Sequence, residues 1–388
     1  MLIGHKYSAF CFVIIIFFLI LFLTAGLLHA QNYEFHGQAS GWFSLGDQAS
    51  QRFRVGARYL PAFSLQKNIS KKINIDLEFS LNAYGNGFIQ NSDGFETDGD
   101  IKPYRIWIRI SAPQFELRLG LQKINFGPAV LLRSLMWFDR IDPRDPLQIT
   151  DGVYGMLMRY YFLNNANIWI WGLYTNDEPK GWEILAPKPN SWELGGRAQT
   201  PLLTGELGLT YHHRTIGDQD LIDLITTQDG TFPENRYAVD GRWDIVIGLW
   251  FEASMIHQKI PDYPYRYRKT MTLGMDYTFG IGNGLHILGE YFNMTFSKDA
   301  WSTGERVRFT ALSLDYPLGL LDHVRLMIYY DWDSRDLYRF VSWQRTYDRW
   351  SFYVMGYWNP ERFLIYQTPE QVNLFTGLGI QLMAVFNH

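Results

Sequence analysis

Charged residues of both signs are concentrated in one stretch of the chain, residues 127–151. The stretch contains six charges close together, namely Arg133, Asp139, Arg140, Asp142, Arg144 and Asp145. Fixed charges beside a narrow, water-poor passage act strongly on a passing ion, because little solvent screens them. We interpret these six residues as candidates for charges that act on a passing ion or solute. The alternative is a surface loop whose charges pair with one another.

A second set of charged residues alternates with apolar residues, as strands with one charged and one apolar face do. These candidates for a charged lumen wall are Arg52, Arg54, Arg58, Asp76, Glu78, Arg105, Arg109, Glu116 and Arg118. A guanidinium group binds carboxylates and phosphates through two parallel hydrogen bonds, so an arginine-rich wall favours anions. The alternative is that the acidic residues pair with the arginines and only stabilise the wall.

The N-terminal residues 1–30 have the pattern of a secretory signal peptide. Lys6 precedes an apolar run over residues 9–23, and Ala30 stands directly before Gln31. This order of a basic start, an apolar core and a small residue predicts cleavage after residue 30 and export of residues 31–388. The alternative is an uncleaved anchor helix. The only cysteine, Cys11, lies in the signal, so the exported chain contains no disulfide or thiol chemistry.

The composition of the rest of the chain indicates a sheet protein of the membrane. Aromatic residues make up 17% of the chain, and no second apolar run approaches the roughly 18 residues of a membrane helix. A closed β-sheet spans a bilayer without such a run, because every backbone group is paired within it. Aromatic girdles and strict alternation are typical of such barrels. The alternative is a secreted β-sandwich or propeller, whose apolar faces would pack together.

The alternation predicts a single-domain, all-β, antiparallel transmembrane barrel of about 18 strands, with 16 as the alternative. Short links such as 112–114 and 163–166 alternate with long ones such as 127–151 and 176–190. Short periplasmic turns and long extracellular loops have this parity in outer-membrane barrels. The predicted strands are 33–45, 52–66, 71–84, 101–111, 115–126, 152–162, 167–175, 191–199, 204–214, 236–244, 247–257, 268–279, 285–295, 305–316, 323–332, 336–346, 349–357 and 372–386.

One motif resembles a known family. The segment Leu119–Gly127, followed by Asp142-Pro143-Arg144-Asp145, resembles a signature of porin-like outer-membrane proteins of Gram-negative bacteria. In that signature a Gly-Arg-Gln strand leads into Trp-Gly or Phe-Gly and a loop containing Asn-Pro-x-Asp. Here Leu121 stands where Arg is usual, and Asp142 replaces Asn. The resemblance implies a general or anion-porin-like barrel in which the third long loop folds into the lumen and narrows it. By this resemblance, the six charged residues of the stretch 127–151 are candidates for the pore constriction. Within this loop we expect one or two helical turns over residues 129–136.

The resemblance also implies a function. It implies a channel in the bacterial outer membrane for passive diffusion of small polar or anionic solutes. The expected partners are outer-membrane lipid, these solutes, the barrel-assembly machinery during biogenesis and, in some members of such families, further copies of the chain. The mildly acidic net charge of −4, without clusters of Lys or Arg, gives no reason to expect nucleic-acid binding. One alternative is a non-conducting barrel that serves as a structural or binding subunit of an envelope assembly.

Catalytic chemistry has little support in the sequence. The motifs G-x-S-x-G and H-E-x-x-H are absent. His212 and His213 are adjacent on a predicted strand, so they point to opposite faces and cannot ligate one metal together from that strand. We therefore predict no enzyme activity, no metal site and no cofactor. The remaining alternative is an outer-membrane enzyme that acts on lipid through an outward-facing Ser or His.

Overall fold

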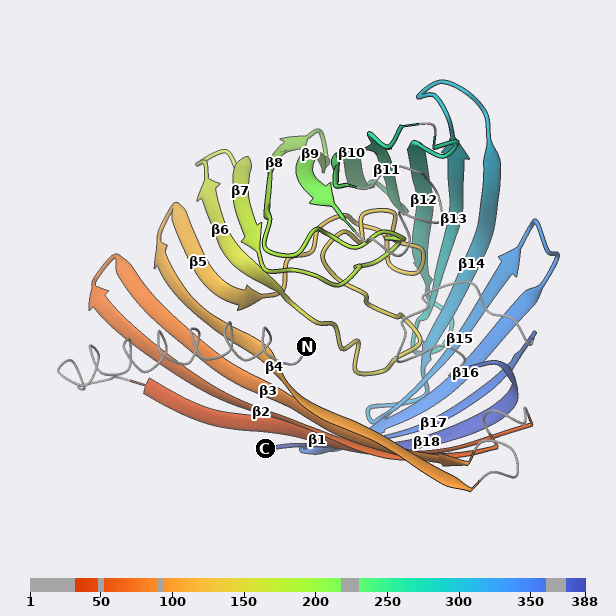
Figure 1. Cartoon of the computed structure of the whole chain (residues 1–388). Helices are drawn as coiled ribbons and strands as arrows, with labels where there is room; N and C mark the ends of the chain where they lie inside the picture. The colour runs from red at the N-terminus through yellow and green to blue at the C-terminus, as the bar shows by residue number, and fades with distance from the viewer. Residues whose placement is uncertain (1–31, 48–51, 90–93, 218–229, 262, 361–374) are drawn as a thin grey trace.

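Eighteen antiparallel strands form one closed sheet in the computed structural model, which describes residues 32–47, 52–89, 94–217, 230–261, 263–360 and 375–388. Each strand pairs with its neighbours in sequence, and β1 also pairs with β18, which closes the barrel (Figure 1). The strands are β1 (Asn32–Gly46), β2 (Phe53–Ser70), β3 (Ile73–Ile89), β4 (Phe95–Ala112), β5 (Phe115–Gln122), β6 (Val153–Tyr161), β7 (Asn167–Tyr174), β8 (Trp192–Leu202), β9 (Gly205–Ile216), β10 (Phe232–Asp244), β11 (Gly248–Gln258), β12 (Tyr267–Phe279), β13 (Leu285–Ser297), β14 (Glu305–Pro317), β15 (Asp322–Asp331), β16 (Leu337–Thr346), β17 (Trp350–Asn359) and β18 (Gly377–Asn387).

The predicted fold class and strand number are confirmed, and the alternative of 16 strands is wrong. The proposed signal peptide, residues 1–30, lies outside the described residues. Among the residues described, no helix is long and apolar enough to cross a bilayer.

The predicted alternation of short and long connections is also present. Turns such as 71–72, 113–114 and 203–204 join strands at one end of the barrel, where β1 starts and β18 ends. The connections at the opposite end include the two longest that the structure describes in full, 123–152 and 175–191. The link expected over residues 85–100 is shorter, because β3 and β4 extend further along it. The strand expected over 115–126 stops at Gln122, where the chain turns into the lumen.

The two faces of the barrel differ as the alternation predicts along β9. Leu209 and Tyr211 are exposed on the outer face, while Thr210, His212 and Arg214 are buried on the inner face. Outward apolar side chains meet lipid in a membrane barrel.

The inner face of β13 to β17 does not follow this prediction. Large aromatic side chains are buried there, among them Phe292, Phe309, Tyr329, Tyr338 and Tyr357. An apolar side chain inside a barrel needs a partner other than lipid. The loops that enter the lumen supply this partner.

Candidate functional site

The loop over residues 123–152 lies inside the ring of strands (Figure 1). Its residues Ala129, Leu132 and Met136 belong to one apolar cluster with the wall residues Phe292 and Phe309. The helical turns expected over 129–136 are absent, and bends and turns occupy this segment. The difference has a physical cause, because the backbone N–H groups here bond to side chains of the barrel wall instead of to carbonyls one turn away.

A second apolar cluster fixes the two ends of the same segment. Phe126 stacks on Trp171 of β7 with ring centroids 6.0 Å apart, and Phe138 meets Trp171 edge-on at 5.5 Å. Leu135 and Trp137 are buried in this cluster too. The loop therefore shares a packed apolar core with the wall of the barrel.

Two glutamates of the wall hold the loop backbone. Glu290 on β13 accepts hydrogen bonds from the N–H groups of Val130 (2.7 Å), Leu131 (2.9 Å) and Leu132 (2.6 Å). It also accepts one from the Trp250 indole at 3.0 Å.

Glu252 on β11 accepts hydrogen bonds from the N–H groups of Ala129 and Leu135, both at 2.9 Å. Hydrogen bonds to a charged acceptor are roughly twice as strong as neutral ones. We call Glu252 and Glu290 the carboxylate latch.

Gly127 permits the close approach of the loop to this latch. Its φ of +91° lies in the left-handed region, which residues with a side chain avoid. A Cβ at this position would stand 2.2 Å from Oε1 of Glu252. The glycine of the Phe126-Gly127 pair is therefore needed for the contact between loop and wall.

A second loop, residues 175–191, also reaches inward and braces the first (Figure 1). The indole of Trp182 donates a hydrogen bond to the carbonyl of Arg133 at 2.7 Å. The same ring stacks on Phe292 with centroids 5.0 Å apart. Trp182 thus joins the two loops to the wall.

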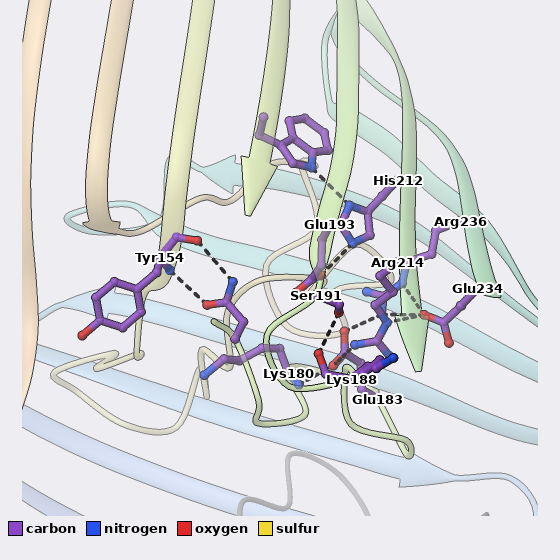
Figure 2. A network of polar contacts seen from close by, with 12 residues as sticks. Tyr154, Lys180, Glu183, Lys188, Ser191, Glu193, His212, Arg214, Glu234 and Arg236 are labelled. Atoms are coloured by element: carbon purple, nitrogen blue, oxygen red, sulfur yellow. Dashed lines mark hydrogen bonds and ion pairs between the residues drawn. The ribbon is translucent and has the colours of Figure 1, made fainter. Parts of the chain in front are cut away.

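A buried ionic network anchors this second loop. Figure 2 shows Glu183 of the loop with Arg214 of β9 and with Arg236 and Glu234 of β10. Glu183 lies 2.8 Å from Arg214 and 2.5 Å from Arg236, and Glu234 lies 2.6 and 2.7 Å from the same two guanidinium groups. All four side chains are almost fully buried. Two acids and two bases balance each other in this network.

His212 lies beside this network in a fixed orientation (Figure 2). The Trp171 indole donates to Nδ1 of His212 at 3.2 Å, so the proton of a neutral ring is on Nε2 and faces Glu193 at 3.1 Å. His213 faces outward and contacts Asn235, with Nδ1 3.0 Å from the amide oxygen. The two histidines are thus on opposite faces.

The structure brings most of the six loop charges into pairs within the loop. Arg144 binds Asp142 through both oxygens at 2.6–3.0 Å, and Arg133 binds Asp139 at 2.8 Å. Asp145 accepts hydrogen bonds from the N–H groups of Leu147 and Ile149 at 2.9 and 3.3 Å. Arg140 contacts Thr150 through its backbone, and its buried Nε has no hydrogen-bond partner. The loop lies within the lumen, and its charges largely neutralise one another.

Some arginines of the wall form ion pairs with its acidic residues. Arg109 binds Asp76 at 2.9 Å, and Arg118 binds Glu116 at 3.1 Å. Arg105 donates instead to the carbonyls of Tyr104 and Thr150. No hydrogen bond or ion pair of Glu78 is seen within the described residues. Arg52 precedes β2 and is exposed.

Arg54 and Arg58 are contacted by aromatic rings, and no acid pairs with either of them among the described residues. The Arg58 guanidinium lies 5.7 Å from the Trp42 ring centroid and 5.5 Å from that of Tyr84. Arg54 lies 5.7 Å from the ring of Phe88. Cation–π contacts hold a guanidinium in place without neutralising its charge.

A cavity of about 90 Å³ separates this part of the wall from the loop, between the inner faces of β1, β2, β3 and β18 and the segment 142–147. A larger hollow of about 1000 Å³ belongs to the outer face, where small side chains such as Ala39, Ala57 and Ala83 leave the sheet uncovered. Only the first is in the lumen. No group of three or more His, Cys, Asp or Glu residues able to hold a metal occurs in the described part of the chain.

Solved outer-membrane barrels share this architecture over 92% of the chain. OccAB1 of Acinetobacter baumannii has a TM-score of 0.54 and 8% sequence identity, and the match covers 95% of that chain. OmpF of Salmonella typhi in complex with daunomycin has a TM-score of 0.51 and 10% identity, and the match covers 97% of that chain. The trimer form of OmpT, an outer membrane protein of Vibrio cholerae, has a TM-score of 0.50 and 10% identity, and the match covers 99% of that chain. The fold is that of outer-membrane porins. No protein-family model and no curated protein match the sequence.

Several residues that shape this porin-fold lumen were not found from the sequence. They are Glu252 and Glu290 of the carboxylate latch, and Trp182 and Glu183 of the second loop. Glu252 and Glu290 stand on the inner faces of β11 and β13, and each is the only acid on a strand that has no Lys or Arg. That imbalance was the available signal for a partner elsewhere in the fold.

Proposed function

We propose that this protein is a porin-like channel of the bacterial outer membrane, through which small polar solutes diffuse passively with a preference for anions. The observation that carries the proposal is a closed 18-stranded barrel with an inward loop that faces Arg54 and Arg58, which have no acidic partner among the described residues. A barrel of this strand number is wide enough for an aqueous lumen. The trimer form of the Vibrio cholerae protein supports a homo-oligomer.

We infer that solutes pass on the side of the lumen where the loop 123–152 leaves a cavity against the wall. The loop 123–152 packs on the inner faces of β7 and of β11 to β17, and the loop 175–191 packs against β9, β10 and Phe292. The cavity lies beside Arg54 and Arg58, where Leu147 of the first loop packs in one apolar cluster with Trp42 and Met383. A solute that passes the loop there meets a positively charged wall.

Planar-bilayer recording of purified, folded protein tests the channel. We expect discrete current steps whose size increases with salt concentration. Protein that inserts into the bilayer and never gives current steps would refute the proposal.

The preference for anions is expected to depend on Arg54 and Arg58. Replacing both with glutamate reverses the wall charge at the cavity, so the reversal potential in a salt gradient should shift toward cation preference. Arg52→Glu is a matched control, because Arg52 is exposed at the end of the strand. A reversal potential that moves equally in both variants would show that position in the cavity does not matter.

The pH dependence of the selectivity is expected to reflect Asp145. Burial raises the pKa of Asp145, and the nearby Asp142 raises it further, although the N–H groups of Leu147 and Ile149 and the charge of Arg58 act in the opposite direction. Asp145 therefore becomes neutral at a higher pH than an ordinary aspartate. Since this removes a negative charge from the cavity wall, anion preference should increase as the pH falls. Asp145→Asn should flatten that change in reversal potential, whereas Asp244→Asn at the exposed barrel end should not.

A non-conducting barrel is the second candidate function. The apolar clusters that the loops form inside the lumen favour it, because such packing resembles a permanent core. The chain would then serve as a structural or binding subunit of an envelope assembly. The bilayer experiment separates the two functions, since this candidate gives no current.

A further inference from the structure

The cavity of about 90 Å³ in the lumen has the features of a ligand site. Side chains of Trp42, Arg54, Arg58 and Tyr84 line it from the wall, together with the amides of Asn86 and Gln381. The volume exceeds several times the roughly 10–15 Å³ that a single water molecule needs. It therefore has room for a small molecule as well as for water.

The two guanidinium groups in this cavity have no anionic partner. No carboxylate lies within 4.0 Å of Arg54 or Arg58 among the described residues, and neither makes a hydrogen bond there. Nε of Arg58 is buried without a hydrogen-bond partner. Asp98, beyond β3 on β4, acts on Arg54 only at longer range. A buried donor without a partner is costly, so an anion that fills this position gains from it.

The acids that also line the cavity are already engaged. Asp142 binds Arg144 through both oxygens, and Asp145 accepts from two backbone N–H groups. Asp142 is thereby neutralised, whereas Asp145 keeps its charge and acts on Arg58 at longer range. Two guanidinium groups thus face one carboxylate that is not ion-paired. The uncompensated charge of the cavity is therefore positive.

The remaining lining is partly apolar. Trp42, Leu147, Phe375 and Met383 face the cavity beside the arginines. A fully hydrated ion such as inorganic phosphate gains little from these contacts, whereas an organic acid buries its carbon chain against them. Cation–π contacts with Trp42 and Tyr84 help to hold the Arg58 guanidinium in place and so pre-position its donors.

We propose that this cavity is a binding site for a small organic monocarboxylate, with its carboxylate on Arg54 and Arg58 and its short apolar chain against Trp42 and Met383. The proposal rests on the proposed channel function. It names a class of solute that binds in this cavity while it passes through the channel. Guanidinium groups bind carboxylates and phosphates alike, so the apolar contacts decide between these two classes.

Isothermal titration calorimetry on the detergent-folded full-length chain tests the site, with butyrate as the probe and inorganic phosphate as the competing anion. We expect butyrate to bind more tightly than phosphate. Arg58→Met keeps the apolar stem and removes the donors, and it should weaken butyrate binding at least tenfold. Arg58→Lys should lose less, because the charge remains and only the fork of donors disappears.

Arg109→Met is the matched control, because Arg109 faces the same lumen but is paired with Asp76 outside the cavity. It should bind butyrate like the unaltered chain. Equal butyrate binding by the unaltered chain and Arg58→Met, or tighter binding of phosphate than of butyrate, would overturn the proposal. Calorimetry needs no ion flow, so failure of this site and failure of the channel are distinguishable.

Discussion

Glu290→Ala is expected to release the loop 123–152 from the wall and to increase single-channel conductance severalfold, with added current noise. The carboxylate of Glu290 binds three consecutive N–H groups of the loop and the indole of Trp250. Alanine leaves all four donors without this acceptor in a buried place. Since hydrogen bonds to charged groups contribute about 1.5–3 kcal/mol each and are not additive, we expect a loss of about 2–5 kcal/mol in the free energy of unfolding.

Glu206→Ala is the control for this latch. Glu206 belongs to the inner face of β9, and its carboxylate accepts from the Gln199 amide without touching the loop. It should leave conductance and noise close to the unaltered values. Unchanged conductance of Glu290→Ala, measured beside a lowered unfolding midpoint, would show that the latch stabilises the barrel without holding the passage.

Glu234→Ala is expected to destabilise the barrel more than any single exposed change. Glu234 is fully buried and neutralises Arg214 and Arg236 together with Glu183. Without it, two guanidinium groups share one carboxylate in a dry interior. Breaking a buried ion pair in this way costs about 3–5 kcal/mol, because an uncompensated charge remains. Urea unfolding in lipid vesicles, followed by tryptophan fluorescence, measures this loss.

Asp244→Ala provides the comparison. Asp244 pairs with Arg242 at 3.1 Å, but its side chain is 66% exposed. Exposed pairs contribute about 0–1 kcal/mol, so this variant should unfold close to the unaltered chain. A similar loss of unfolding free energy in Glu234→Ala and Asp244→Ala would mean that burial does not set the contribution of the ionic network to stability.

The barrel was predictable because its strands obey a local rule. A stretch such as Phe115–Gln122 alternates between apolar and polar residues, and its pattern alone defines two faces. Turn lengths indicated that short and long connections alternate. Both this alternation and the two faces of each strand depend on residues that are near one another in sequence. Strand ends were less predictable, as at Gln122, since an inward turn depends on what the following loop meets.

The interior of the lumen was not predictable in the same way. Glu290 and Leu132 lie 158 residues apart in sequence, and no periodicity links them. The buried rings of Phe309 and Tyr329 occupy faces that simple alternation assigns to polar residues. Only the position of the loop in three dimensions explains why an apolar inner face is stable there. The loop charges were recognised as a group, yet the pairing of Arg144 with Asp142 depended on the folded backbone.

The closure of β1 onto β18 has a consequence for how the barrel assembles. Gln38 pairs with Asn387, so the last contact of the ring requires the final strand of the chain. Until that strand is in place, β1 and the newest strand both present unpaired backbone edges that invite pairing with other chains. Contacts so distant in sequence also make folding intrinsically slow. A chain shortened before residue 377 should therefore accumulate as aggregates instead of as smaller barrels.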